Sequence, residues 1–224
     1  MIERILPPPV AAAESFGDDP YATLFPGEQA AIANAVESRR REFATGRACA
    51  RRALAQLGQC SVAVLRGPGG PPQWPDGTVG SITHCAGYRA AAVAVAADVL
   101  SLGIDAEPDE PLPNDGMLDL IASPVERVRL RELATGTPGI NWDRLLFSAK
   151  ESVYKTWFPL ARRWLGFESA DVIIDASTHT FTARLLVTGP LVNGSPLSLL
   201  PGRWLSCRGF LVTAIVVPAV IPTA

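Results

Sequence analysis

The sequence predicts an α+β protein with two similar lobes, each a helix packed on a small antiparallel sheet. In each half of the chain, a segment with helical periodicity precedes several short segments of alternating apolar residues. A proline-rich link at residues 108–113 separates the halves, so we expect an N-terminal lobe over residues 1–108 and a C-terminal lobe over residues 109–224. Because clefts between lobes are common ligand sites, we expect the active site there.

The first half is expected to begin with an extended, proline-rich segment. Apolar spacing then predicts a helix over residues 27–57, which Gly58 would end, and allows a bend near residues 37–41. The segment Gly-Pro-Gly-Gly-Pro-Pro at residues 67–72 is a loop, because glycine and proline interrupt regular structure. Alternating apolar residues predict strands at residues 61–65, 79–83, 90–97 and 102–105.

In the second half, the same reasoning predicts helices at residues 116–133 and 141–158, with Asn141 as the N-cap of the latter. Strands are expected at residues 170–175, 179–188, 202–207 and 209–217. The apolar segment from residue 209 to residue 224 is too short to span a membrane and contains two prolines. Its β-branched residues favour a final strand instead.

Composition narrows the class of protein. The 224 residues are 48% apolar, which is enough for a sizeable core, and the net charge of −2 removes the strongest reason to expect a nucleic-acid binder. The four cysteines show no paired metal-ligand spacing, so we expect no disulfide. The first residues lack the basic start and apolar core of a secretory signal, so we expect a cytoplasmic protein without a membrane association.

Two motifs place acidic side chains where they could share one site. Asp105 and Glu107 lie two residues apart after an apolar stretch, so they face the same side near the end of a strand. Glu151 and Lys155 lie four residues apart in a predicted helix, so they share a helical face. Carboxylates from a strand and a helix suit a hard divalent cation such as Mg²⁺. Adjacent lysines, Lys150 among them, would balance phosphate charge.

Both motifs also have simpler interpretations. An isolated Asp-x-Glu is usually solvated surface charge. The segment Ser148–Glu151 matches a capping box, which would make Glu151 a helix-start residue. We favour the metal interpretation because Asn141 is a better helix start, and because two acids facing one way beside a core strand repel each other unless a cation intervenes.

A basic segment at residues 39–52 is a second candidate site. Taken alone it fits a solvated helix face. Arg40, Arg47 and Arg51 fall near one face by helical spacing, and guanidinium groups arranged in this way hold phosphate well.

One of the two histidines is a further candidate. His84 ends a short predicted strand, and a lone histidine is more often a packed or surface residue than a functional one. With Ser81 and Thr83 before it, His84 is also able to bind phosphate oxygens. We assign His179 to the surface.

Taken in order, four segments resemble the 4′-phosphopantetheinyl transferases: the arginine segment, Gly-Ser-Ile-Thr-His-Cys, Gly-Ile-Asp-Ala-Glu, and Phe-Ser-Ala-Lys-Glu-Ser-Val-Tyr-Lys-Thr-Trp. The resemblance covers residues 37–167 and is to the monomeric two-lobed group of the surfactin-synthesis type, especially its actinobacterial members. It implies a monomer that transfers the 4′-phosphopantetheine group from coenzyme A to a serine of an apo acyl or peptidyl carrier protein. The second product would be adenosine 3′,5′-bisphosphate.

The resemblance also implies a role for each matching residue. The magnesium ligands would be Asp105, Glu107 and Glu151, and the pyrophosphate-contacting lysines would be Lys150 and Lys155. The 3′-phosphate and adenine end of coenzyme A would be held by Arg39, Arg47, Arg66 and His84, with Thr83 as a further candidate. Asp105, Glu151 and Lys155 would act in catalysis, and Glu151, or a water that it orients, would accept the serine proton.

The sequence departs from the family pattern in two places. Gly70-Pro71-Pro72 stands where many relatives carry Lys or Glu, so we assign no nucleotide contact to a side chain there. Arg66 stands where relatives often have lysine, which keeps the charge but changes its geometry. One choice stays open, because the resemblance favours Arg39 as the nucleotide contact whereas helical spacing favours Arg40.

Two alternative functions use the same residues. A magnesium-dependent phosphoesterase would use the carboxylates to activate water, although two-metal enzymes of this kind usually need more ligands. A non-catalytic coenzyme A binding protein is the other alternative. The residues do not identify the carrier proteins, so fatty acid, polyketide and nonribosomal peptide synthesis all remain candidates.

Overall fold

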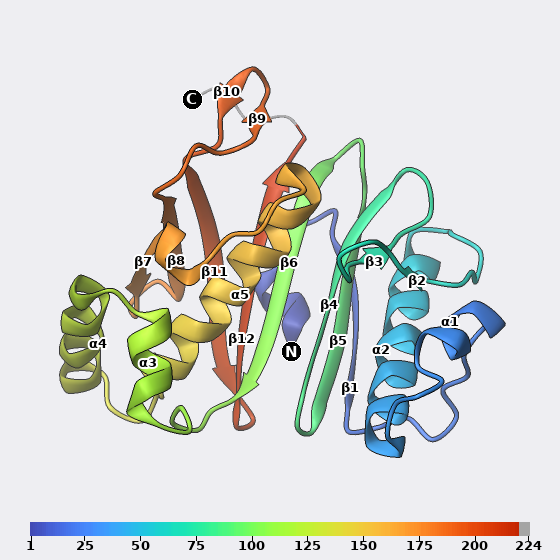
Figure 1. The fold of residues 1–224 in the computed structure, drawn as a ribbon, viewed down its shortest axis with the longest axis horizontal. Helices are drawn as coiled ribbons and strands as arrows, with labels where there is room; N and C mark the ends of the chain where they lie inside the picture. Colours follow the sequence, from blue (N-terminus) through green and yellow to red (C-terminus); the bar gives the residue numbers. More distant parts are fainter. Residues whose placement is uncertain (220–224) are drawn as a thin grey trace.

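The computed structural model describes residues 1–219 of the chain as two lobes side by side, each with helices packed on an antiparallel sheet (Figure 1). The elements of the first half are η1 (Ile2–Ile5), β1 (Ala11–Phe16), α1 (Pro26–Ala31), α2 (Glu37–Gln56), β2 (Leu65–Arg66), β3 (Pro72–Gln73), β4 (Thr78–Cys85), β5 (Tyr88–Val95) and β6 (Val99–Pro108). Those of the second half are α3 (Asp115–Ile121), α4 (Pro124–Gly136), α5 (Trp142–Ala161), η2 (Phe167–Ser169), β7 (Ala170–Asp175), β8 (Thr180–Leu185), β9 (Leu191–Val192), β10 (Ser195–Pro196), β11 (Leu199–Cys207) and β12 (Phe210–Pro218). The expected fold class is confirmed.

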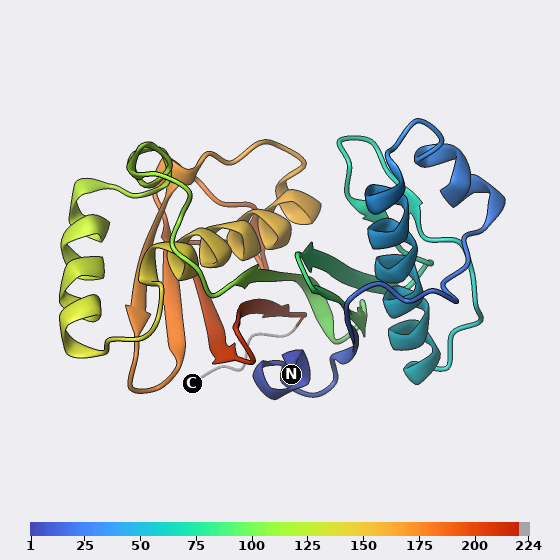
Figure 2. The same ribbon diagram turned by 90° about the horizontal axis from the view of Figure 1, so that it is seen from below.

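The two larger sheets have the strand orders β1-β5-β4 and β6-β12-β11-β8-β7. Helix α2 packs on the first sheet and α5 on the second, and Figure 2 shows these two helices on the separate lobes. Strand β6 is hydrogen-bonded to β12, with Asp105 opposite Thr213. Strand β6 therefore belongs to the five-stranded sheet, together with the strands of the second half. The lobe boundary between residues 108 and 109 stays a prediction.

The lobes meet where β4 lies beside β6 (Figure 1). These strands belong to different sheets, and side-chain hydroxyls of β4 bond to the backbone of β6. The Ile104 N–H donates to Ser81 Oγ (3.2 Å), and the Ala106 N–H donates to Thr83 Oγ1 (3.0 Å). Because buried N–H groups need partners, these hydroxyls hold the lobes in a fixed register.

Helix α5 approaches β6 closely at Gly103. A Cβ atom at this position would lie 2.2 Å from the Ser152 carbonyl oxygen and 2.5 Å from Thr156 Oγ1. Only glycine leaves room for the helix backbone there. The glycine of the Gly-Ile-Asp-Ala-Glu motif therefore brings the face of α5 that carries Glu151 and Lys155 towards the end of β6.

Three apolar cores hold this arrangement. One lies between α5 and the five-stranded sheet and includes Trp157 and Trp204, and another lies between α2 and the three-stranded sheet. The third contains Tyr88 of β5, Ile104 of β6 and Val212 of β12. Since it draws residues from both sheets, the lobes share buried apolar surface and are not merely tethered.

The structure corrects several predicted boundaries in the first half. The helix expected over residues 27–57 is two helices, α1 and α2, separated by a turn at residues 32–36. Ala11–Phe16 forms β1, which the sequence analysis missed because alanine favours strands weakly; pairing with β5 fixes it. Of the strand predicted at residues 61–65, only residue 65 is in a strand, β2.

In the second half, the helix expected over residues 116–133 is also two helices. Ser123 caps α4 through a capping box with Glu126, and Pro124 occupies the first turn, so the chain restarts there. Asn141 lies at the N-cap of α5 as expected, but its side chain bonds Asp109 rather than the helix.

The expectations for the last strand, the cysteines and His179 are met within residues 1–219. The final strand is β12, and residues 220–224 of the segment assigned to it lie outside the described residues. All four cysteines are free thiols, and His179 is exposed. In the described chain no helix combines the length and apolar character needed to cross a membrane.

Candidate active site

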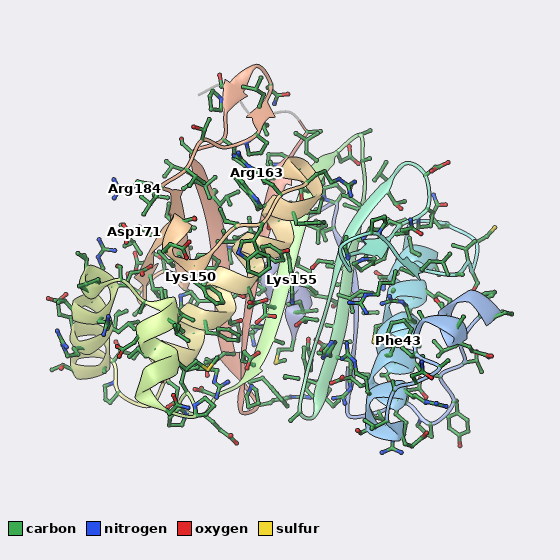
Figure 3. All side chains as sticks on the ribbon, viewed as in Figure 1. Phe43, Lys150, Lys155, Arg163, Asp171 and Arg184 are labelled. Carbon is green, nitrogen blue, oxygen red and sulfur yellow. The ribbon has the colours of Figure 1, made fainter. Side chains whose placement is uncertain are left out.

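A cleft of about 830 Å³ lies between the lobes. Its walls include the loop at residues 66–72, strand β4, and Glu151, Tyr154 and Lys155 of α5. Figure 3 shows Lys155 near the middle of the molecule, close to the boundary with the N-terminal lobe. The cleft therefore brings the helix motif of the second half against elements of the first half.

Asp105 lies at the base of the acidic part of the site. Its side chain is 6% exposed, and Oδ1 accepts hydrogen bonds from Lys155 Nζ (2.7 Å) and Thr83 Oγ1 (3.1 Å). The other carboxylate oxygen, Oδ2, is buried and has no hydrogen-bond partner among the described residues. An orphaned carboxylate oxygen is costly to bury, so it indicates a place for a ligand.

Glu107 is held by a cation from α5. Arg144 Nη1 lies 3.0 Å from Glu107 Oε2, and Arg144 also donates to the carbonyls of Glu110 and Pro111. Burial raises the pKa of Glu107 to about 7, and the nearby Asp105 carboxylate adds to this rise while Arg144 opposes it. The Glu107 carboxyl group therefore titrates near neutral pH in the metal-free protein.

Glu151 is the third acid. Burial raises the pKa of Glu151, and the Asp105 carboxylate raises it further. Asp105 thus influences both other acids, as expected of carboxylates that share a neighbourhood. Within residues 1–219, however, no three His, Cys, Asp or Glu side chains lie close enough together to hold a metal ion in this arrangement.

The donor set nevertheless fits a divalent cation. Oxygen ligands suit Mg²⁺, and Asp105 Oδ2 is a buried oxygen with no partner in the described chain. Lys155 and Arg144 supply positive charge to Asp105 and Glu107 in this structure. A cation bound here would replace part of that charge.

A second cavity of about 380 Å³ lies beside α2, and it is lined by four cationic or imidazole side chains from different elements: Arg39, Arg47, Arg66 and His84. Arg47 is 6% exposed, and its Nε has no hydrogen-bond partner within the described residues. Burial lowers the pKa of Arg47 to about 10. The guanidinium stacks on Phe43 at 4.1 Å from the ring centroid, and Phe43 is labelled on α2 in Figure 3. A buried cation with an unused donor indicates an anion site.

The neighbouring arginines Arg39 and Arg40 make different contacts. Arg39 Nη1 lies 2.8 Å from His84 Nε2, in the basic cavity. Arg40 instead donates to the carbonyl oxygens of Ala35 (2.8 Å) and Ala33, in the turn before α2. Arg39 therefore lines the cavity and Arg40 does not, while a nucleotide contact of Arg39 stays a prediction.

Two expected ligand contacts are not supported by the structure. Lys150 is 3% exposed, and Nζ donates to the carbonyl oxygens of Ile121 (2.7 Å) and Phe167 (2.9 Å) and to Glu126 Oε2 (2.9 Å). All three of its donors are used, so it has none left for a pyrophosphate. Thr83 is 1% exposed and points at Asp105, so its placement fits a role in positioning that acid rather than in binding a nucleotide.

Sequence reasoning missed two charged residues of the site. Arg144 lies seven residues before Glu151 and eleven before Lys155, a spacing that places all three on one face of α5, so a longer helical pattern would have found it. Glu42 lines the basic cavity. In the sequence it is one glutamate among several arginines, and this pattern does not indicate that its side chain lies in an anion site.

Neighbouring acids and a basic cavity, both at the meeting of two α+β lobes, suit an enzyme that transfers a phosphorylated group. The 4′-phosphopantetheinyl transferase N-terminal domain family matches residues 27–94, and the 4′-phosphopantetheinyl transferase superfamily matches residues 101–193. These two matches cover most of the chain and follow one another along it.

Curated relatives match over nearly the whole length. The chain is 52% identical to the 4′-phosphopantetheinyl transferase Svp of Streptomyces mobaraensis, over 100% of the chain and 92% of the relative. It is 47% identical to PptT of Mycobacterium tuberculosis (96% and 97% covered) and 48% identical to Npt of Nocardia iowensis (96% and 99% covered). The chain belongs to the 4′-phosphopantetheinyl transferase family, in its two-lobed surfactin-synthesis type, and it is an enzyme that modifies carrier proteins.

Proposed function

We propose that the enzyme takes the 4′-phosphopantetheine group from coenzyme A and transfers it to a serine hydroxyl of an apo acyl or peptidyl carrier protein. Adenosine 3′,5′-bisphosphate is the second product. The observation that carries this proposal is Asp105 Oδ2, a buried oxygen without a hydrogen-bond partner among residues 1–219, on a carboxylate bonded to Lys155 of the interlobe cleft. A cationic cavity lies beside this cleft. Such a site suits a donor such as coenzyme A, whose adenosine carries a 3′-phosphate and a 5′-diphosphate.

The nucleotide end of the donor is proposed to lie in the basic cavity. Arg39, Arg47, Arg66 and His84 line it, and the buried Arg47 guanidinium gains a partner when a phosphate enters. Guanidinium groups match phosphate oxygens in geometry and charge. Gly70 and Pro72 of the loop at residues 67–72 line both this cavity and the interlobe cleft.

The diphosphate is proposed to lie against the acids at the lobe boundary. Asp105, Glu107 and Glu151 would hold Mg²⁺, which supplies charge neutralisation at the diphosphate and at the departing bisphosphate. Lys155 contacts Asp105 from the cleft wall, and its ammonium is placed to exchange this partner for a phosphate oxygen. Its positive charge then balances charge that develops on the leaving group.

The transfer itself moves one proton and exchanges one phosphorus–oxygen bond. The serine oxygen attacks the phosphorus that bears pantetheine, and the bond from this phosphorus to the bisphosphate oxygen breaks. The serine proton goes to Glu151 or to a water that Glu151 orients. A carboxylate bound to a cation is a poor base, so with Mg²⁺ bound a water that Glu151 orients suits this role better than Glu151 itself. Positioning and charge supply the remaining rate enhancement.

The acceptor is proposed to dock near α3 and the start of α4. Leu120 is 77% exposed and Val125 is 55% exposed, so this surface from Met117 to Val125 offers apolar contacts. We further propose that the enzyme acts as a monomer in the cytoplasm. The identity of the carriers is a question for a panel of apo carrier proteins.

The test combines the purified protein, coenzyme A, Mg²⁺ and an apo carrier protein, with the mass of the carrier as the readout. The proposal predicts that the carrier gains one phosphopantetheine group and that Asp105→Ala reduces the rate by about 10² or more. Breakdown of coenzyme A without any modified carrier would instead support the phosphoesterase alternative. Binding without any reaction would support the non-catalytic one.

A further inference from the structure

We propose that Glu42 is a positioning residue of the basic cavity, which holds Arg39 and His84 as one unit that grips a phosphate monoester. The inference rests on the proposed function only in taking the phosphate monoester of coenzyme A as the anion. Glu42 lies three residues after Arg39 on α2, and its side chain is 19% exposed. It is the acid that lines a cavity otherwise rich in cations.

The three side chains form a closed ring of contacts. Glu42 Oε2 accepts a hydrogen bond from Arg39 Nη1, and Glu42 Oε1 lies 3.1 Å from His84 Nδ1. Arg39 Nη1 lies 2.8 Å from His84 Nε2 and closes the ring. Each member therefore touches both others, and together they join α2 to the end of β4.

The ring determines which nitrogen of His84 carries the proton. Arg39 Nη1 lies 2.8 Å from Nε2 and 3.5 Å from Nδ1 of His84, so the guanidinium lies against the imidazole near both ring nitrogens. A carboxylate only accepts, so Nδ1 bears the hydrogen and donates to Glu42. A positive guanidinium this close to the ring opposes a second proton, so the state that we propose for the ligand-free cavity is the neutral Nδ1–H imidazole. Burial lowers the pKa of His84, which favours the same state.

Charged groups that influence His84 come from three elements. Glu42 and Arg39 come from α2, Arg89 from β5 and Lys155 from α5. Arg89 Nη2 lies 2.8 Å from Asp18 Oδ1 and 4.0 Å from Glu42 Oε1, so Asp18 takes most of its charge. Glu42 is consequently the carboxylate that can balance a positive charge on the imidazole.

This balance explains why an acid lies in an anion site. When a phosphate monoester enters, it accepts from Arg39 and offsets the guanidinium charge, so His84 Nε2 can take a proton from solvent. The imidazolium donates from Nε2 to the phosphate and from Nδ1 to Glu42. Without the carboxylate, the imidazolium would lie half-buried beside three cations, Arg39, Arg89 and Lys155, which is unfavourable. The unpaired arginine would also lose its fixed orientation.

The experiment measures binding of adenosine 3′,5′-bisphosphate and adenosine 5′-monophosphate by calorimetry, without a carrier protein. Glu42→Gln keeps the side-chain shape and removes the charge. We expect it to weaken bisphosphate binding about tenfold or more and to leave monophosphate binding within about twofold. The matched control is Glu37→Gln on the exposed start of α2, which should change neither.

Each other outcome counts against a specific claim. If Glu42→Gln binds the bisphosphate as tightly as the wild type or more tightly, simple charge repulsion dominates and the inference is wrong. Equal losses for both nucleotides would make Glu42 a merely structural residue. If the wild type itself does not distinguish the two nucleotides, the nucleotide site of the proposed function fails instead.

A second measurement protects the test against misfolding. Glu42→Asp keeps the carboxylate but shortens it, and ¹⁵N NMR of His84 reports the protonated nitrogen directly. We expect an Nδ1–H imidazole in the free wild type and a doubly protonated ring with the bisphosphate bound. A ring that stays neutral in the complex would overturn the inference.

Discussion

The hydroxyl of Thr83 on β4 donates to Oδ1 of Asp105 on β6 (3.1 Å) and accepts from the N–H of Ala106 (3.0 Å). One side chain thus both joins the lobes and fixes the acid at their boundary. Because Lys155 also bonds Oδ1, the second oxygen of Asp105 is left for a ligand. The metal site that we propose therefore depends on the contact between the lobes.

Thr83→Val should weaken Mg²⁺ binding, because it removes the hydrogen bond from Thr83 to Asp105 without changing the size of the side chain. A hydrogen bond to a charged group contributes about 1.5–3 kcal/mol, so the Mg²⁺ concentration for half-maximal activity should rise about tenfold to a hundredfold. Calorimetric titration of Mg²⁺ in the presence of adenosine 3′,5′-bisphosphate gives an independent value. Thr83→Ser, which keeps the hydroxyl, should remain near the wild type.

Ser81→Ala is the matched control for this prediction. Ser81 makes the same kind of contact between the lobes, to the Ile104 N–H, but does not touch Asp105. It should lower the melting temperature without shifting the Mg²⁺ requirement. Equal Mg²⁺ shifts in both variants would mean that the contact between the lobes, rather than the bond to Asp105, controls the metal site.

The sequence was sufficient for the features that depend on local spacing. The strand pair Asp105 and Glu107 and the helix pair Glu151 and Lys155 were correctly placed on β6 and α5, because periodicity determines which side chains share a face. Lys150 was wrongly given a ligand contact. It is adjacent to Glu151 in sequence, but one residue turns the helix by about 100°, and this directs Lys150 towards the buried Glu126.

The features that sequence reasoning missed depend on contacts distant in the chain. Strand β1 is fixed by its pairing with β5, seventy or more residues later, and its alanines carry little strand preference of their own. The Ser123 capping box that divides α3 from α4 was readable in the sequence and was overlooked. The contacts among Arg39, Glu42 and His84 join a helix to a strand, so no local sequence pattern predicts them.

Arg47→Met should separate binding from stability. Arg47 is a buried cation whose Nε is unpartnered in the described chain, so replacing it with an apolar side chain of similar length removes an uncompensated charge. We expect the ligand-free protein to melt at the same or a higher temperature. The KM for coenzyme A should rise tenfold or more, because the phosphate loses a partner.

Arg51→Met is the contrasting variant, one turn further along α2. Arg51 pairs with the fully buried Glu28 at 3.0 Å, so its removal leaves a buried carboxylate without its cation. Breaking such a pair costs about 3–5 kcal/mol. We expect a clear loss in the free energy of unfolding and little change in KM for the folded fraction. The reverse pattern would show that Arg51, not Arg47, serves the ligand.

Lys150→Met and Lys155→Met should affect different properties of the enzyme, the first its stability and the second its kcat. Lys150 neutralises Glu126, which is 1% exposed, so its loss should destabilise the fold by about 3–5 kcal/mol. Lys155 lines the cleft with a 26% exposed side chain, so its loss should reduce kcat about a hundredfold and affect stability less. Denaturant unfolding and carrier modification measure the two effects. A soluble, fully stable Lys150→Met enzyme with reduced kcat would restore the ligand role of Lys150.

Glu107 should make the stability of the metal-free protein depend on pH. Its pKa rises from 4.5 to about 7 in the folded state because of burial and the Asp105 charge. The folded protein therefore binds more protons than the unfolded chain between these values. This contribution to stability is full below about pH 4.5 and is lost as the pH rises through about 7, with a size on the order of 2–3 kcal/mol.

The measurement compares the wild type with Glu107→Gln, whose side chain stays neutral, by denaturant unfolding with a chelator present at pH 5 and pH 8. The variant leaves Arg144 without its carboxylate at both pH values, so the change in stability between them is the informative quantity. The wild type should lose on the order of 2–3 kcal/mol more than the variant between pH 5 and pH 8. Added Mg²⁺ should shrink this difference, because a cation that binds the ionised carboxylate stabilises the folded state at high pH. Parallel pH profiles for the two proteins would mean that Glu107 is already ionised at pH 5, held so by Arg144.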